Sequence, residues 1–223
     1  MISRSAKALF FQIAAPLMRL NGTIYRRFRA PKSGVVKVHL GPGQAKYLQG
    51  WINVDANMFT AKCDVWADLR GKLPFRDNSV DVIYSHHVIE HLPDTRLFFH
   101  FCEMFRCLKS GGVFRVGGPN GDAAIQKFQE GDSTWFNDFP DNRQSLGGRL
   151  ANFILCRGEH LTILTLSWLE ELATAAGFKE LAVLQPVTQT NYPTLIDRAV
   201  LEREWESTPN CPHTLILEGR KDR

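Results

Sequence analysis

The stretch that decides the fold is VVKVHLGPGQAKYLQGWINVDAN, residues 35–57. It holds two short apolar runs, of which the first ends in a Gly-Pro-Gly loop and the second ends in Asp55. In a doubly wound parallel sheet, the loop after the first strand lies where a ligand binds, and glycines there let backbone amides approach it. An acid at the end of the next strand can then reach the two hydroxyls of a ribose. Gly41, Gly43 and Asp55 suit this arrangement, although an ordinary turn is also typical of a lone Gly-x-Gly.

Strand and helix patterns alternate through the rest of the chain. Runs rich in β-branched and aromatic residues predict strands, at residues 35–40, 51–54, 79–84, 113–116, 181–184 and 214–217. Apolar side chains at helical spacing predict a helix over 95–108, ended by Lys109-Ser-Gly-Gly, and a helix over 166–176 with Ser167 as its N-cap. This alternation indicates an α/β fold with a mostly parallel sheet covered on both faces. A length of 223 residues suits one such domain.

The first 33 residues form a basic segment. No acidic residue precedes Asp55, whereas nine of the 27 lysines and arginines do. The apolar stretch 8–18 is shorter than the roughly 20 residues that span a bilayer, and its small-residue signal for cleavage as a signal peptide is poor. We expect a helical segment that packs on its own domain or lies on an anionic membrane surface.

The cysteines and the distribution of charge argue against a disulfide framework, a metal site and a nucleic-acid partner. Five cysteines form no CxxC pair and no metal-ligand spacing with the seven histidines, so we expect free thiols, no metal site and a cytoplasmic location. Nucleic acid is not an expected partner, because the basic residues gather at one end with few aromatic residues for base stacking.

A series of motifs follows the first loop in a fixed order: GWINVD (50–55), DLRGKLPF (68–75), SVDVIY (79–84), HVIEHL (87–92) and LKSGGVFR (108–115). With these motifs the sequence resembles the class I S-adenosylmethionine-dependent methyltransferases, specifically the small bacterial kind with a shortened glycine loop. The resemblance is close over residues 35–120 and looser as far as Gly219. It implies a doubly wound, mostly parallel, seven-stranded Rossmann-like sheet, S-adenosylmethionine as cofactor, and a methyltransferase domain over 34–223.

The resemblance assigns the first cofactor contacts to the opening stretch. Gly41 and Gly43 would face the methionine and ribose part of the cofactor, and Asp55 would hold the ribose diol, unless it only ends a strand. His39 and Pro42 depart from the family pattern, and the proline removes one backbone donor.

Further contacts are implied at the next two strand ends. Asp68, with the backbone of Leu69, would read the adenine amino edge, unless its carboxylate only caps a turn. A carboxylate accepts hydrogen bonds from an exocyclic amine more strongly than a neutral side chain does. Ser85 and His86 would line the methionine end.

The sequence offers four histidines as candidates for a catalytic base, namely His86, His87, His91 and His160. Methyl transfer from a sulfonium is an in-line displacement, and a hydroxyl acceptor needs a base. We predict His160 as the base with Glu159 as its orienter, and His91 as a further candidate, although each of these also suits a structural role. His160 follows a segment with few helix or strand signals, so we expect a long loop at about 120–160 that acts as a lid or acceptor-binding insertion.

The acceptor is the least constrained part of the interpretation. By analogy with similar proteins, we expect O-methylation of a saccharide or lipid-linked glycan, with contact at the inner face of a membrane through residues 1–33; a small-molecule acceptor and the oligomeric state stay open. The alternative is a non-catalytic binding or scaffold protein with a cofactor fold, docked through the same basic segment.

Overall fold

One mixed sheet organises the molecule. The computed structural model describes residues 4–44, 46–57, 59 and 61–222, with side chains from Leu9 onward. Within these residues, seven strands pair in the order β3-β2-β1-β4-β5-β7-β6. Their bounds are β1 (Lys37–Leu40), β2 (Ile52–Asp55), β3 (Val65–Trp66), β4 (Val80–His86), β5 (Leu108–Pro119), β6 (Phe178–Leu184) and β7 (Thr214–Lys221). The first five strands run parallel, and β7 lies antiparallel between β5 and β6. The predicted mostly parallel, seven-stranded Rossmann-like sheet is confirmed.

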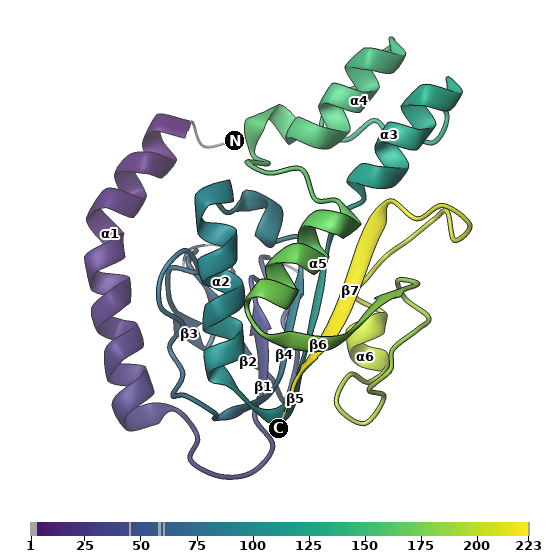
Figure 1. Cartoon of the computed structure of the whole chain (residues 1–223). Coiled ribbons are helices and arrows are strands. Elements are labelled where there is room, and N and C mark those ends of the chain that lie inside the picture. The colour runs from purple at the N-terminus through teal and green to yellow at the C-terminus, as the bar shows by residue number, and fades with distance from the viewer. Residues whose placement is uncertain (1–3, 45, 58, 60, 223) are drawn as a thin grey trace.

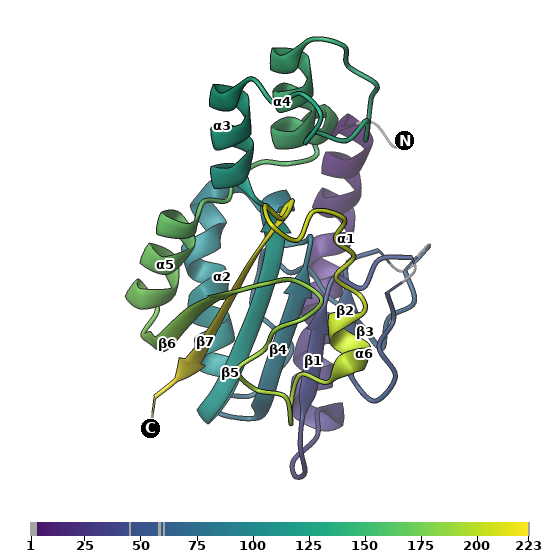
Figure 2. The same ribbon diagram turned by 90° about the vertical axis from the view of Figure 1, so that its right-hand side faces the viewer.

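Helices cover both faces of the sheet, as predicted. One face carries α2 (Asp94–Cys107) and α5 (Leu166–Ala175), and the opposite face carries the short α6 (Arg198–Leu201) (Figures 1 and 2). Leu97, Phe101 and Met104 recur at helical spacing on α2 and are completely buried against the sheet. Each such side chain contributes about 1.5–3 kcal/mol by leaving water.

The N-terminal segment forms a long helix at the β3 edge. Helix α1 (Arg4–Ile24) continues into the π-helical turn η1 (Tyr25–Arg29) and runs along the side of the sheet (Figure 1). Asn21 donates a hydrogen bond from its side chain to the Trp66 carbonyl at 2.8 Å, and Met18 is buried. No helix among the described residues has the length and apolarity needed to cross a bilayer.

The prediction of a long loop at about 120–160 is wrong, because this segment contains α3 (Gly121–Glu130) and α4 (Leu146–Leu155). Each helix has a side-chain cap: Asn120 accepts from the Ala123 amide, and Ser145 accepts from the Gly148 amide. The two helices pack around a buried aromatic pair, Trp135 and Phe136, and project above the sheet (Figure 1). Caps and tertiary packing therefore outweigh the weak helical pattern of the segment.

Two further local predictions are wrong. Ser167 is not the N-cap of α5, because that helix begins one residue earlier and the Leu166 amide donates to the Asp122 carboxylate at 2.7 Å. Lys109–Gly112 do not form a turn that ends the helix. Helix α2 already ends at Cys107, and β5 begins directly at Leu108.

Candidate functional site

The carboxyl ends of three parallel strands meet at one edge. Leu40 of β1 pairs with Val54 of β2 and with Ser85 of β4. The residues that follow these positions therefore come together, as the doubly wound topology requires.

The glycine loop and Asp55 are in direct contact. The Gly43 amide donates to Asp55 Oδ2 at 3.0 Å, and the Asn57 amide donates to Oδ1 at 2.8 Å. These amides orient the half-buried carboxylate and leave lone pairs on its oxygens for further donors. Gly43 has φ +57°, and no atom lies within 4 Å of the place where its Cβ would be, so it borders open space. Gly41, by contrast, packs so tightly that its Cβ would lie 2.3 Å from Val88.

Asp68 forms an ion pair with its neighbour Arg70. The guanidinium donates Nε to Oδ1 at 2.9 Å and a terminal nitrogen to Oδ2 at 2.8 Å, and the ring of Phe11 from α1 lies 3.6 Å from the guanidinium carbon. Burial raises the pKa of Asp68, but the hydrogen bonds and charge of Arg70 hold it below its usual value. A purine amino group would share this carboxylate with Arg70. The adjacent Leu69 carbonyl accepts from His100 Nδ1 at 3.0 Å.

The end of β4 presents polar atoms without partners. Ser85 Oγ and His86 Nε2 are buried, and neither has a hydrogen-bond partner within the described part of the chain. Lys46 Nζ lies 3.0 Å from His86 Nδ1; because an ammonium only donates, Nδ1 is the acceptor and Nε2 carries the ring proton. Burial holds the pKa of His86 well below its usual value, which keeps the ring neutral. The sequence analysis missed Lys46, because a single lysine in a loop has no distinguishing pattern.

This edge fits a nucleoside that carries a polar tail. The open space beside Gly43 leaves room for such a ligand. The half-buried carboxylate of Asp55 can accept hydrogen bonds from it, and the two unpartnered polar atoms at the end of β4 can form hydrogen bonds with it. An unsatisfied buried polar atom costs about 1–3 kcal/mol, so a ligand that satisfies it gains affinity. Gly41, Gly43, Asp55, Ser85 and His86 are thus brought together, whereas Asp68 and Leu69 lie beyond the β3 end with partners of their own.

A cavity of about 730 Å³ adjoins the β4 end. Segments that are distant in sequence line it, namely the loops after β1 and β4, the end of β5, the helical insertion with the residues that follow it, and the chain that leads into β7: Lys46, His87, Glu90, His91, Pro119, Asn137, Phe139, Pro140, Asn152, Phe153, Cys156, Glu159, His160, Trp205, Glu206, His213 and Thr214. Another cavity, of about 650 Å³ beside α6, shares none of these residues.

Of the predicted base candidates, His87, His91 and His160 line this cavity. His91 Nδ1 lies 2.9 Å from the Glu159 carbonyl oxygen, and His160 Nδ1 lies 3.1 Å from the Ile154 carbonyl oxygen. The two imidazole rings are 5.1 Å apart between centroids. Glu159 therefore orients His91 through its backbone oxygen. Burial lowers the pKa of His160, so its ring is neutral near pH 7.

Glu90 is the central residue that the sequence analysis missed. It belongs to the short helix η2 (Ile89–His91), its side chain is completely buried, and its Oε1 lies 3.0 Å from His87 Nδ1. Burial raises the pKa of Glu90, but the hydrogen bond from His87 and the charges of His87 and His91 hold it below its usual value. His87 has φ +55°, an uncommon conformation that is often found at functional sites. The i, i+3 spacing of His87 and Glu90 in HVIEHL was the available signal.

Comparisons with known proteins find a methyltransferase domain over part of the chain. The sequence profile described as "Methyltransferase domain" matches residues 21–116. Over 49 residues the chain is 51% identical to a "probable S-adenosylmethionine-dependent methyltransferase" of Mycolicibacterium smegmatis, and this stretch is 22% of the chain and spans only 18% of that relative. The fold is similar to that of a methyltransferase from Thermotoga maritima, with TM-score 0.52, 16% identity, and coverage of 97% of this chain and 95% of the other. A methyltransferase from Archaeoglobus fulgidus also has TM-score 0.52, with 15% identity and coverage of 95% and 99%.

The solved structures show the fold, and the sequence matches show a methyltransferase domain over part of the chain. Over residues 21–116 the chain matches a methyltransferase domain, as the motifs predicted, and its fold is that of solved S-adenosylmethionine-dependent methyltransferases. Its cofactor is S-adenosylmethionine, which supplies an electrophilic methyl group. Gly43, Asp55, Ser85 and His86 are the residues that would hold it at the edge described above.

Proposed function

We propose that this chain methylates a hydroxyl group of a saccharide, carried on a lipid-linked glycan, at the cytoplasmic face of a membrane. The observation that carries this proposal is the cavity of about 730 Å³ next to the β4 end. Its wall combines aromatic rings, among them Phe139, Phe153 and Trp205, with histidine and carboxylate groups. A wall of this kind suits a saccharide, because the C–H faces of a sugar pack on aromatic rings and its hydroxyls form hydrogen bonds with polar side chains.

The base for a hydroxyl acceptor comes from the same cavity. His87 Nδ1 donates to the buried Glu90 carboxylate, which fixes the tautomer and leaves the lone pair on Nε2. In the proposed reaction Nε2 takes the hydroxyl proton, the oxygen forms a bond to the methyl carbon, and the carbon–sulfur bond breaks as S-adenosylhomocysteine leaves. The predicted candidates His91, His160 and Glu159 line the same space and remain alternatives for this step.

The exposed face of α1 supports a membrane-bound acceptor. One apolar stripe follows helical spacing and is 41–71% exposed; it consists of Leu9, Ile13, Leu17, Leu20 and Ile24 of α1, and Phe28 of η1. Arg26, Arg27 and Arg29 follow directly in η1. An apolar stripe next to basic residues suits an anionic lipid surface, to which each cation adds about 1 kcal/mol.

Cofactor binding is tested first by calorimetry. S-adenosylmethionine and S-adenosylhomocysteine should both bind, and Asp55→Ala should weaken binding by about 1–3 kcal/mol because charge-assisted hydrogen bonds are lost. The matched control is Asp94→Ala, which replaces another carboxylate at the first position of α2.

The acceptor is tested with cofactor that carries a labelled methyl group. Incubation with lipid-linked glycans, free oligosaccharides and small hydroxylated metabolites should transfer label to the lipid-extractable glycan, in a bond that resists mild base as an ether does. Label that enters only free metabolites would refute the lipid-linked acceptor.

Membrane binding has its own experiment. The unaltered chain should float with vesicles that contain anionic lipid, and Ile13→Glu should reduce this by about tenfold or more, because an apolar anchor is lost and a like charge is added. Val183→Glu, on β6, makes the same change at another exposed position (47%) and should bind as before. Equal flotation of both variants would refute the role of α1.

A further inference from the structure

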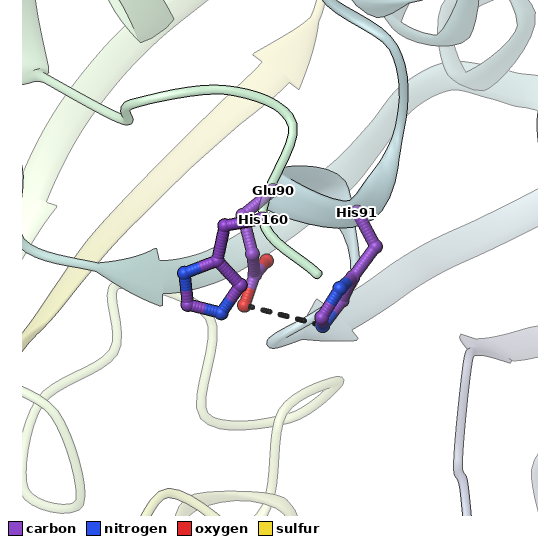
Figure 3. A group of neighbouring side chains, drawn as sticks. All are labelled: Glu90, His91 and His160. Atoms are coloured by element: carbon purple, nitrogen blue, oxygen red, sulfur yellow. Dashed lines mark ion pairs between the residues drawn. The ribbon is translucent and has the colours of Figure 1, made fainter. Parts of the chain in front are cut away.

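Three side chains converge on one point of the cavity wall. Glu90 and His91 follow β4 in the chain, and His160 follows α4. Figure 3 shows their polar ends turned toward one another, and one ligand-type atom from each lies within 4.8 Å of the others. His91 Nε2 is 4.0 Å from Glu90 Oε1, too far for a direct hydrogen bond.

Both histidines are held in the tautomer that can bind a metal. A carbonyl oxygen only accepts, so His91 Nδ1 carries the proton toward Glu159, and His160 Nδ1 carries the proton toward Ile154. Each Nε2 is then left with a lone pair. Metal-binding histidines usually have their second ring nitrogen fixed by a backbone carbonyl or a carboxylate in this way.

Glu90 supplies a carboxylate with one oxygen that its described surroundings leave without a hydrogen-bond partner. Its side chain is completely buried, and Oε2 has no hydrogen-bond partner within the described residues. A buried carboxylate costs several kcal/mol unless it is paired. His87, which contacts Oε1, is its nearest described partner, and that ring is 41% exposed.

We propose that Glu90, His91 and His160 form a binding site for a divalent transition-metal ion of the zinc type. Two imidazoles and one carboxylate form a known catalytic zinc ligand set, in which the fourth position stays open. At metal–ligand distances of about 2.0–2.2 Å, the three atoms would approach one another by about 1 Å. The open position faces the cavity, because all three residues line it.

The site was not foreseen from the sequence. The expectation of no metal rested on ligand spacing along the chain, and 69 positions separate His91 from His160. Only the packing of the helical insertion above the sheet brings the two rings together.

A bound ion would assist the proposed reaction. An acceptor hydroxyl in the open position would release its proton more readily, to His87 Nε2, and the resulting oxygen would attack the methyl group. This role depends on the proposed function, whereas metal binding itself does not.

The test uses the full chain, free of any histidine tag and treated with chelator. Titration with Zn²⁺ against a chromophoric chelator should give one site per chain, and Co²⁺ should give the visible bands of a four-coordinate ion. His91→Gln and His160→Gln should each lower Zn²⁺ affinity by more than about 100-fold, since loss of an outer contact alone costs 10–100-fold. His213→Gln alters another histidine of the same cavity and should bind Zn²⁺ as the unaltered chain does.

Binding of S-adenosylhomocysteine by each variant establishes that it is folded. Absence of Zn²⁺ and Co²⁺ binding by the unaltered chain, or equal binding by the folded His91 and His160 variants, would overturn the site. Either result would leave cofactor binding and methyl transfer in place, so failure of this proposal is distinct from failure of the proposed function.

Discussion

Completely buried carboxylates occur in two clusters, which differ in how fully their oxygens are paired. In the closed cluster (Arg115, Glu204 and Glu218) every carboxylate has partners, and in the open cluster (Glu90 with His87 and His91) one oxygen has none among the described residues. In the closed cluster, Arg115 donates to both oxygens of Glu204 at 2.6 Å and to Glu218 at 2.7 Å. Glu218 accepts further hydrogen bonds from the Thr190 hydroxyl and the Asn191 amide. Every charge in this cluster meets an opposite charge or a donor.

In the open cluster, the Glu90 carboxylate meets two imidazole groups: His87 Nδ1 lies 3.0 Å from Oε1, and His91 Nε2 lies 4.0 Å from it. Its second oxygen has no partner in the described part of the chain. The closed cluster joins the segment before β7 to the sheet, whereas the open cluster borders a cavity. The difference indicates that a buried carboxylate oxygen left without a hydrogen-bond partner marks the place where a ligand completes the network.

The closed cluster should show the largest effect on stability. Arg115→Met leaves two carboxylates buried without their cation, so the free energy of unfolding should fall by about 3–5 kcal/mol. Urea denaturation measures this change. Arg198→Met is the matched control, because Arg198 is 90% exposed in its pair with Glu202 and should contribute less than about 1 kcal/mol. Similar losses from both variants would remove the distinction between the clusters.

The pair of His213 and Glu206 is intermediate between the closed and the open cluster. Its contribution to stability should depend on pH. His213 donates Nδ1 to Glu206 at 3.0 Å and Nε2 to the Trp135 carbonyl oxygen at 2.5 Å, so both ring nitrogens are protonated. Burial lowers the pKa of His213, but these two acceptors outweigh it and raise the pKa above its usual value of 6.5. Burial also raises the pKa of Glu206, yet the hydrogen bonds from His213 and Thr208 bring it to about 2.

The sign of the pH effect follows from these directions. A raised pKa in the folded state means that the His213 contribution is complete below pH 6.5 and is lost as the pH rises through the folded value. We expect a loss of about 1 kcal/mol on this limb, the size of one hydrogen bond. The Glu206 contribution is lost as the pH falls from 4.5 through about 2. Thermal unfolding across pH should show the upper limb in the unaltered chain and a flatter one in His213→Gln; identical slopes would contradict the pairing.

The comparison also explains what the sequence could predict. The mostly parallel sheet could be predicted from the alternation of strand and helix patterns. Gly43 and Asp55 could be assigned to one site because they lie only 12 positions apart, on either side of the loop between two strands. Strand β3 was missed, because a strand of two residues leaves no alternating pattern.

Neither buried cluster could be assembled from the sequence. The contact of Arg115 with Glu204 joins residues 89 positions apart, and that of His91 with the Glu159 carbonyl joins residues 68 positions apart. Single charged residues at such separations carry no periodic signal, and their meeting depends on how the later helices pack. The histidines were predicted as candidates from their residue type. Glu90, the acid between them, was missed because a single carboxylate carries no such signal.

The open cluster should show the smallest effect on stability and a large effect on turnover. Glu90→Gln keeps the shape of the side chain and removes a buried charge, so the relief of desolvation offsets the loss of one charged hydrogen bond from His87. The free energy of unfolding should change by less than about 1 kcal/mol in urea denaturation. Methyl transfer should fall by roughly 10²- to 10⁴-fold, because the carboxylate no longer orients the imidazole that takes the proton. Binding of S-adenosylmethionine should persist, since Asp55 and Gly43 are untouched. A variant that unfolds like Arg115→Met, or that keeps full turnover, would show that Glu90 serves the fold and that its unpartnered carboxylate oxygen does not mark the site.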